Sequence, residues 1–431
     1  MKVLFFVILL AGVGNTVLRP EIENPLTLYR IIAPLGFLLV FGSRPVLVIK
    51  GTGLFFVFFL YNFLLARFYS SDLSQFYPSM VHYFYLFILL ILMVDMKSRF
   101  QDFDRSFVRF MHIFYPFLFL NLLFEYFFGS FYPNLYTEER ALRAFFWNEN
   151  DLAVVLCIFG WFALSYDRYR GFPRILIVLL IVGVLFYNDS KAALLSFLFV
   201  SVPISIIFAW CRTGRISPGV WRTFFALVAL CFVAVIVLLS NTVLNFESGE
   251  YTFNDLLIRP VVNILTLESS GETWGSLNNR TDAAIFTIIE YLKSFGFGLG
   301  AGGSWLVLTL PQYELGGAQS PHNALLQFTV DFGYPVLVGF LYAVFWALRR
   351  LFAPGADSHT RLKVMAILSF PILGLSQSGA IVTNYMFFAV AFYIFLLDRN
   401  IGGRRRIPRE PIGPVGKHSL ATLHNGRPIF P

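Results

Sequence analysis

Repeated apolar runs of about 17–22 residues constrain this chain more than any other feature of its sequence. A helix of that length crosses a hydrocarbon layer about 30 Å thick, because each helical residue advances the chain by about 1.5 Å. Only 13% of the residues are charged, whereas about a quarter of the residues are charged in soluble proteins. The sequence therefore predicts an all-α polytopic membrane protein and excludes a soluble globular fold.

The apolar runs predict about 12 transmembrane helices. Their approximate bounds are 3–18, 28–42, 51–66, 80–95, 107–128, 150–166, 174–188, 191–210, 222–241, 334–350, 364–380 and 383–398. The first run resembles a signal peptide with Lys2 as its basic residue, but it has no convincing small-residue cleavage site. We therefore interpret it as the first span.

The distribution of charged residues predicts the orientation of the spans. An even number of spans places both termini on one side of the membrane. That side holds 24 of the 33 Lys and Arg residues, whereas the other side holds 9 of them and 18 of the 25 acidic residues. Basic loops stay in the cytoplasm, so both termini are predicted to be cytoplasmic. The formal net charge of +8 is then mostly a sorting signal, and no nucleic-acid partner is expected.

Four regions follow from this topology. Residues 1–241 form an N-terminal bundle of about nine spans, and residues 242–333 form a large, partly helical periplasmic loop. Residues 334–398 supply the last three spans, and residues 399–431 form a basic cytoplasmic tail that is predicted to be disordered. The three cysteines lie in or beside apolar runs, so neither a disulfide framework nor a cysteine-rich metal site is expected.

Two residues of the periplasmic loop are candidates for catalysis. Arg280 is expected at the start of one loop helix, and His322 in the first turn of another. A guanidinium can hold two phosphate oxygens at once, and an imidazole with an unperturbed pKa of ~6.5 can accept a proton from a hydroxyl. Two ordinary alternatives remain open: Arg280 in a salt bridge with Asp282 or Glu290, and His322 bonded to the backbone.

Further polar segments are predicted to face the same side. NDSKAALLS places Ser190 and Lys191 at the outer start of a span, where a cation binds lipid-borne phosphate or simply reaches the headgroups. NEND places Asn148 and Asn150 at another outer helix start, where they bind sugar hydroxyls or cap the helix. The glycines within 296–303 lack the Lys-Ser or Lys-Thr pair of a P-loop and predict tight turns or close approach of the backbone to a substrate.

At these positions the sequence resembles the O-antigen polymerase and O-antigen ligase superfamily of bacterial membrane glycosyltransferases. Fifteen residues separate Arg280 from Gly296, and ten separate His322 from Gly333; both spacings are similar to motifs of that superfamily. NEND and NDSK look like further landmarks, although the family usually has serine-arginine where this chain has Ser190-Lys191. The similarity covers mainly the C-terminal two-thirds of the chain.

The resemblance implies a donor glycan carried on undecaprenyl diphosphate at the outer face of a bacterial inner membrane. The sugar–diphosphate bond already stores the energy of transfer, so no nucleotide, cofactor or metal is expected. Arg280, helped by Lys191, would stabilise the diphosphate leaving group, and His322 would deprotonate the acceptor hydroxyl. Asn323 would support His322 or bind sugar.

Three functions remain open at this point. We favour polymerisation of O-antigen or exopolysaccharide repeat units over ligation of O-antigen to the lipid A core. A polysaccharide transporter or flippase is the third, although transporters tend to keep ionisable residues at the membrane midplane and often have repeated halves. The expected partners are the lipid-linked donor, a glycan or lipid acceptor, membrane lipids, a chain-length regulator and a separate flippase.

Overall fold

A computed structural model describes the chain in several stretches. The described residues are 1–13, 27–129, 142, 144, 146, 149–166, 171–188, 190–213, 243–246, 249–252, 262–263, 266, 276–310, 313, 323–353, 356–376 and 385–395. All of them belong to one compact unit, Met1–Leu397. The expected span 222–241, the candidate residues Asn148 and His322, and the tail 399–431 lie outside the described residues.

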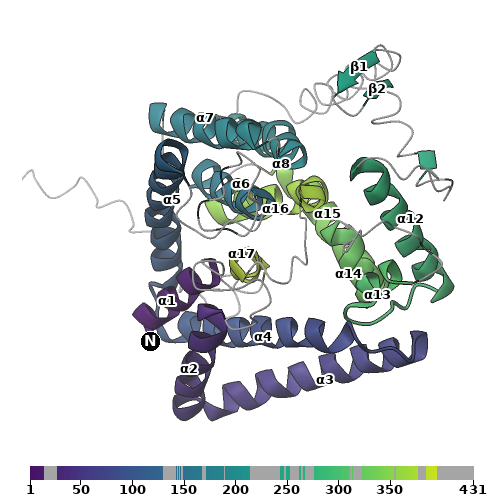
Figure 1. The fold of residues 1–431 in the computed structure, drawn as a ribbon. Coiled ribbons are helices and arrows are strands. Elements are labelled where there is room, and N and C mark those ends of the chain that lie inside the picture. Colours follow the sequence, from purple (N-terminus) through teal and green to yellow (C-terminus); the bar gives the residue numbers. More distant parts are fainter. Residues whose placement is uncertain are drawn as a thin grey trace, which may run out of the picture. The chain divides into compact units, whose positions relative to one another are not determined.

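The described part of the N-terminal half is helical (Figure 1). Its helices are α1 (Lys2–Val13), α2 (Leu28–Ser43), α3 (Pro45–Tyr69), α4 (Phe76–Arg99), α5 (Phe103–Phe128), α6 (Glu149–Ser165), α7 (Phe172–Tyr187), α8 (Lys191–Ser196) and α9 (Val202–Thr213). A π-helical turn, Phe197–Ser201, joins α8 to α9, so the predicted span 191–210 forms one run of helix. A helix bonds its own backbone groups, as a lipid environment demands.

The described part of the C-terminal half contains helices and one short hairpin. The helices are α12 (Ser276–Lys293), α13 (Gly303–Leu308), α14 (Ala324–Phe332), α15 (Tyr334–Leu351), α16 (Ser358–Leu373) and α17 (Tyr385–Phe395), with a 3-10 turn at Gly374–Ser376 after α16. The strands are β1 (Val243–Phe246) and β2 (Gly249–Thr252), which pair antiparallel with Val243 opposite Thr252. The all-α prediction omitted this hairpin, whose β-branched and aromatic residues favour extended backbone.

Five of the described helices are long and apolar enough to cross a membrane. They are Pro45–Tyr69, Phe76–Arg99, Phe103–Phe128, Ala192–Cys211 and Tyr334–Leu351. Shorter apolar helices occupy other predicted spans: Lys2–Gly12, Leu28–Ser43, Asn150–Ser165, Phe172–Tyr187 and Tyr385–Phe395. A mainly helical protein of the membrane type is therefore confirmed, whereas the number of twelve spans and the cytoplasmic termini remain predictions.

Ion pairs gather the start of the chain and two turns at one end of the helices. Lys2 at the start of α1 pairs with Asp102, between α4 and α5, at 2.7 Å. Arg44, between α2 and α3, and Arg99 of α4 both pair with the buried Asp95. Helices α1 to α5 therefore alternate in direction, which is the arrangement that consecutive membrane spans require.

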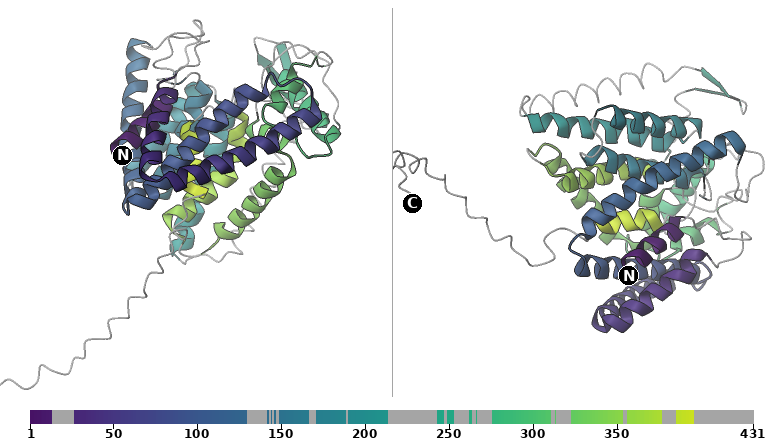
Figure 2. Two further views of the ribbon diagram at one scale, coloured as in Figure 1. Left: turned by 90° about the horizontal axis from the view of Figure 1, so that it is seen from below. Right: turned by 90° about the vertical axis from the view of Figure 1, so that its left-hand side faces the viewer.

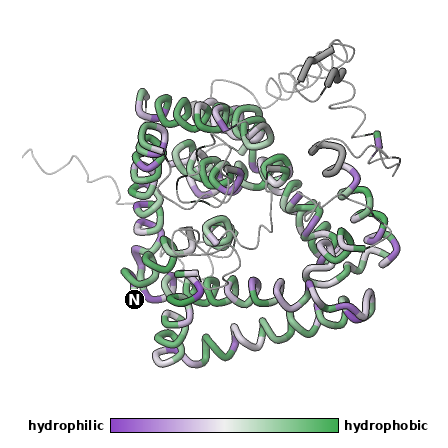
Figure 3. The backbone as a smooth tube through the Cα atoms, viewed as in Figure 1, coloured by the Kyte–Doolittle hydropathy of each residue, from purple (hydrophilic) through white to green (hydrophobic). Residues whose placement is uncertain are grey.

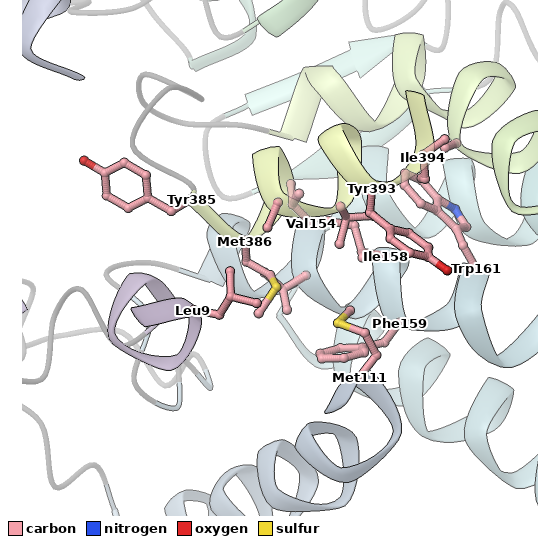
Figure 4. Close-up of a cluster of buried hydrophobic side chains, with 14 of the residues drawn as sticks. Leu9, Met111, Val154, Ile158, Phe159, Trp161, Tyr385, Met386, Tyr393 and Ile394 are labelled. Atoms are coloured by element: carbon pink, nitrogen blue, oxygen red, sulfur yellow. The ribbon is translucent and has the colours of Figure 1, made fainter. Parts of the chain in front are cut away.

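The core of this unit surrounds α17, which packs against α1, α4, α6 and α16 (Figure 1). Figure 4 shows Met386 of α17 beside Leu9 of α1. Two turns farther along the same face of α17, the ring of Tyr393 stacks on Phe107 of α5 with 4.5 Å between ring centroids. Large apolar side chains thus join helices that are far apart in the sequence.

Two of the long helices present apolar side chains outward. Residues of α3 such as Phe56 and Phe68, and residues of α15 such as Leu341 and Phe345, are mostly exposed. Figure 3 shows that both helices are hydrophobic along most of their length. A soluble protein rarely exposes so much contiguous apolar surface, so this surface is expected to contact lipid.

Candidate functional site

The two motif glycines of the predicted periplasmic loop lie against each other. Gly296 follows the end of α12, and Gly333 follows the end of α14. The Tyr334 N–H donates a hydrogen bond to the Gly296 carbonyl at 3.0 Å. A Cβ atom on Gly333 would lie only 2.2 Å from the Phe297 carbonyl oxygen, and the φ angle of Gly333 is 78°. Both the close approach and the left-handed backbone require glycine at this position.

From this junction α12 and α14 run side by side. Tyr291 of α12 and Val330 of α14 belong to one buried cluster close to the junction, and the two helices pack on each other. Farther from the junction, Phe286 and Leu326 pack against the same cluster. The N-terminal ends of both helices therefore point the same way. Arg280 lies about 9 Å farther along α12 than Phe286, at 1.5 Å per helical residue.

The structure corrects where both helices begin. The sequence predicted that α12 starts at Arg280, but α12 starts at Ser276, so Arg280 lies one turn inside the helix. The second loop helix was predicted to include His322 in its first turn. It starts at Ala324 instead, with Asn323 as its N-cap. The side chain of Arg280 and the whole of His322 lie outside the described part of the chain.

Asn323, a predicted substrate-binding residue, has a structural role at the start of α14. Its side-chain oxygen accepts a hydrogen bond from the Leu326 N–H at 3.0 Å. Such a cap satisfies one of the N–H groups that the first helical turn leaves without a partner. The cap fixes the point at which α14 begins, and His322 directly precedes it.

The glycine-rich segment 296–303 docks onto protein backbone. The Leu299 N–H donates to the Val330 carbonyl at 2.8 Å, and the Gly300 N–H donates to the Asp331 carbonyl at 2.9 Å. A Cβ atom on Gly300 would lie 2.6 Å from the Asn62 carbonyl oxygen of α3. The structure supports the predicted tight turns and shows that the glycines let this segment approach the backbone of α3 and α14 closely, whereas close approach to a substrate stays a prediction.

Asp331 binds the end of the glycine-rich segment 296–303. Its buried carboxylate accepts hydrogen bonds from the backbone N–H groups of Ser304 (2.8 Å) and Gly302 (3.4 Å), at the start of α13. Burial raises the pKa of Asp331 to about 7, although both backbone donors favour the ionised form. The carboxylate therefore links the end of α14 to the glycine-rich segment, and its charge depends on pH near neutrality.

A second set of polar contacts lies near the starts of α6 and α8. The Asn188 side chain donates to the Leu142 carbonyl (2.7 Å) and accepts from the Leu142 N–H (2.9 Å). The Ala144 N–H donates to the buried Glu125 carboxylate at 2.5 Å. These bonds fix the chain just ahead of α6, and Asn150 lies in the first turn of that helix. NEND and NDSK are thus brought to one end of the protein.

The start of α8 also approaches the start of α14. Ser190 precedes α8 and is buried, and its hydroxyl has no hydrogen-bond partner within the described residues. Helix α8 packs against α16 and against the turn Gly374–Ser376. A Cβ atom on Gly374 would lie 3.5 Å from the Cβ atom of Ala324. The turn Gly374–Ser376 therefore contacts both α8, the helix that Ser190 precedes, and the start of α14.

Sequence reasoning missed Asn188, Glu125 and Asp331 as residues that shape this region. Glu125 had a detectable signal, because a carboxylate inside an apolar span needs a partner. Asn188 stood within the NDSK segment that was already singled out. Asp331 carried no signal of its own, because its partners are backbone groups of a segment that only the fold brings close.

The described residues thus form a mainly helical protein with apolar helices of membrane-spanning length, in which α12 packs on α14 and the start of α14 lies beside the turn Gly374–Ser376. Residues 176–341, which include α8, α12 and α14, match the family model described as O-antigen ligase. This match confirms the predicted resemblance to the O-antigen polymerase and O-antigen ligase superfamily. A comparison with curated proteins found no match. Together with the apolar helices, the family match supports a membrane enzyme that acts on glycans.

Proposed function

We propose that this protein is a membrane glycosyltransferase that polymerises undecaprenyl-diphosphate-linked oligosaccharide repeat units at the periplasmic face of the bacterial inner membrane. The observation that carries the proposal is the meeting of Gly296 and Gly333, the end points of the two spaced motifs. Because α12 and α14 run side by side from there, Arg280 and His322 are expected at one site.

The proposed transfer needs a leaving-group cation and a base. The bond between the anomeric carbon of the donor sugar and the diphosphate oxygen breaks, and the acceptor oxygen bonds to that carbon. The diphosphate leaves with the bonding electrons, and Arg280 and Lys191 stabilise its charge. The acceptor proton passes to His322. The N-terminal end of α12 adds a positive dipole on the same side.

The remaining predicted residues are proposed to contact the glycan or to support the residues that do. Asn150 in the first turn of α6 and Asn148 just before it are proposed to bind sugar hydroxyls, and the buried Ser190 lies where α8 begins. Asn323 is proposed to act through His322, because its side chain already caps α14. A chain-length regulator and a separate flippase remain proposed partners.

Ligation of O-antigen to the lipid A core is the second candidate. The match to a family described as O-antigen ligase favours it. Polymerase and ligase would share the donor, the leaving group and the proton acceptor, and they would differ only in the acceptor molecule. The transporter alternative is less favoured, because the family match points to an enzyme of glycan assembly.

A glycan profile of the native host tests the proposal. A deletion strain carries wild type, Arg280→Ala, His322→Ala or the control His418→Ala, which makes the same change in the predicted cytoplasmic tail. Membrane levels are matched, and surface and lipid-linked glycans are separated by gel electrophoresis. We expect both loop variants to lose at least about 10²-fold of the product, because an essential base contributes about 10²–10⁴-fold, and the control to match wild type.

The form of the loss identifies the reaction. Loss of long chains while single repeats still reach their acceptor means a polymerase. Long chains that accumulate on the carrier lipid and are missing from the core mean a ligase. An unchanged profile in both loop variants contradicts the proposed site and returns the transporter to first place.

A further inference from the structure

The carboxylate of Glu290 is the centre of a buried network on α12. Its side chain accepts hydrogen bonds from the Tyr69 hydroxyl at 2.9 Å, from the Lys293 ammonium at 2.6 Å and from the Tyr313 hydroxyl. Glu290 is only 4% exposed. Burial alone would raise the pKa of Glu290, but the bonds from Lys293, Tyr313 and Tyr69 outweigh burial and hold it below its usual value. Glu290 is therefore ionised at neutral pH.

This network joins three separate parts of the chain. Glu290 belongs to α12, the helix that carries Arg280, and Tyr69 is the last residue of α3. Tyr313 lies in the segment that leads to His322 and α14. Figure 2 shows α12 beside the end of α3, where the bond between Tyr69 and Glu290 is made. The Glu290 carboxylate thus connects α12, which carries Arg280, to the end of α3 and to Tyr313.

A second contact supports the same attachment. The Phe286 ring of α12 stacks on the Tyr313 ring, with 4.3 Å between centroids and 15° between planes. Tyr313 is therefore held by its ring and by its hydroxyl. Stacking fixes the plane of the ring, and a charge-assisted hydrogen bond fixes its direction.

The charge on Glu290 is not explained by stability alone. Burial of the carboxylate costs free energy, and the ion pair with Lys293 returns little of it, because the Lys293 side chain is 58% exposed. An ionised carboxylate that accepts three hydrogen bonds does restrict the positions of its donors, because each hydrogen bond must be close to linear. The network is therefore suited to fixing relative positions.

We propose that Glu290 is a positioning residue that holds Tyr313, nine residues before His322 in the sequence, against the helix that carries Arg280. The inference rests on the proposed function, because it concerns the alignment of those two groups. Glu290 acts through Tyr313 and contacts neither donor nor acceptor. A small misplacement of a catalytic group costs about 10²-fold in rate, so loss of the network is expected to lower the rate of transfer more than the binding of substrate.

Four variants test this role: Glu290→Gln, Tyr313→Phe, the double variant and the control Tyr291→Phe. The control removes the hydroxyl of the next residue of α12, which has no hydrogen-bond partner within the described residues. Each purified protein is reconstituted with lipid-linked glycan extracted from the native host, and kcat, KM and Tm are measured. The same samples are analysed by hydrogen exchange at α12 and around Tyr313.

For Glu290→Gln and Tyr313→Phe we expect kcat to fall by about 10- to 100-fold with KM nearly unchanged, and exchange around Tyr313 to rise. The double variant should be no worse than Glu290→Gln, because both changes break the same network, and Tyr291→Phe should match wild type. A wild-type kcat, or unchanged exchange, in Glu290→Gln overturns the inference. A wild-type protein that transfers no glycan contradicts the proposed function instead, and the exchange data still decide the role of Glu290.

Discussion

At the scale of single residues, the protonation state of Asp331 is expected to affect the stability of the predicted periplasmic loop. Its carboxylate is buried at the end of α14 and accepts hydrogen bonds from two backbone N–H groups at the start of α13. Its pKa is raised to about 7 by burial, whereas an unfolded aspartate titrates at about 3.9. The folded protein therefore binds a proton at this site more tightly than the unfolded chain does.

This difference predicts a pH dependence of stability. The contribution of Asp331 to the free energy of unfolding is fully present below about pH 4 and is lost as the pH rises through about 7. Asp331→Asn removes this titration. Between about pH 5 and about pH 8.5, the Tm of wild type should therefore fall more than the Tm of Asp331→Asn. Thermal unfolding in detergent measures both. Equal falls in Tm would show that Asp331 keeps an ordinary pKa.

At the same scale, the sequence could indicate which residue types take part but not their partners. The choice of Arg280 and His322 followed from chemistry and spacing, and one of the alternatives considered was a bond between Arg280 and Glu290. The described bonds of Glu290 go to Tyr69, Tyr313 and Lys293, and the side chain of Arg280 lies outside the described residues. Two of those partners are distant in the sequence, so no local pattern could have indicated them.

At the scale of elements, periodicity predicted both loop helices but not their first residues. Several residues near the start of α12 suit an N-cap, and tertiary packing decides which one begins the helix. Asn323 caps α14, so His322 precedes the helix and does not lie in its first turn as predicted. The hairpin β1–β2 was missed because four-residue strands give too short a pattern to distinguish from loop.

Because the junction of α12 and α14 leaves no room for a side chain at Gly333, alanine should be tolerated much less well at Gly333 than at the nearby Gly339. Gly333→Ala places a Cβ atom on the Phe297 carbonyl, whereas Gly339→Ala, within α15, meets nothing within 4 Å. We expect Gly333→Ala to lower Tm and to abolish long glycan chains in the native host. Gly339→Ala should keep both, because alanine is favoured over glycine inside a helix by about 1 kcal/mol. Wild-type glycan in Gly333→Ala would contradict a required junction.

At the scale of the whole molecule, charge sorting and apolar runs predicted a helical membrane protein, and the structure agrees with that class. Helices α1 to α5 alternate in direction, as the predicted spans require. The approach of α8 to the start of α14 could not be predicted, because it depends on how α16 and the turn Gly374–Ser376 pack between them.

The central claim is that Arg280 and His322 meet at one site on the outer face of the membrane. A double variant, Arg280→Cys with His322→Cys, tests it most directly in a chain whose native cysteines are replaced by alanine. Intact cells are treated with a short, membrane-impermeant bismaleimide, and Arg280→Cys with Ser419→Cys in the tail is the control pair. We expect an intramolecular cross-link in the first pair and none in the control. Single labelling of both cysteines without a cross-link, or no labelling until the cells are permeabilised, would contradict it.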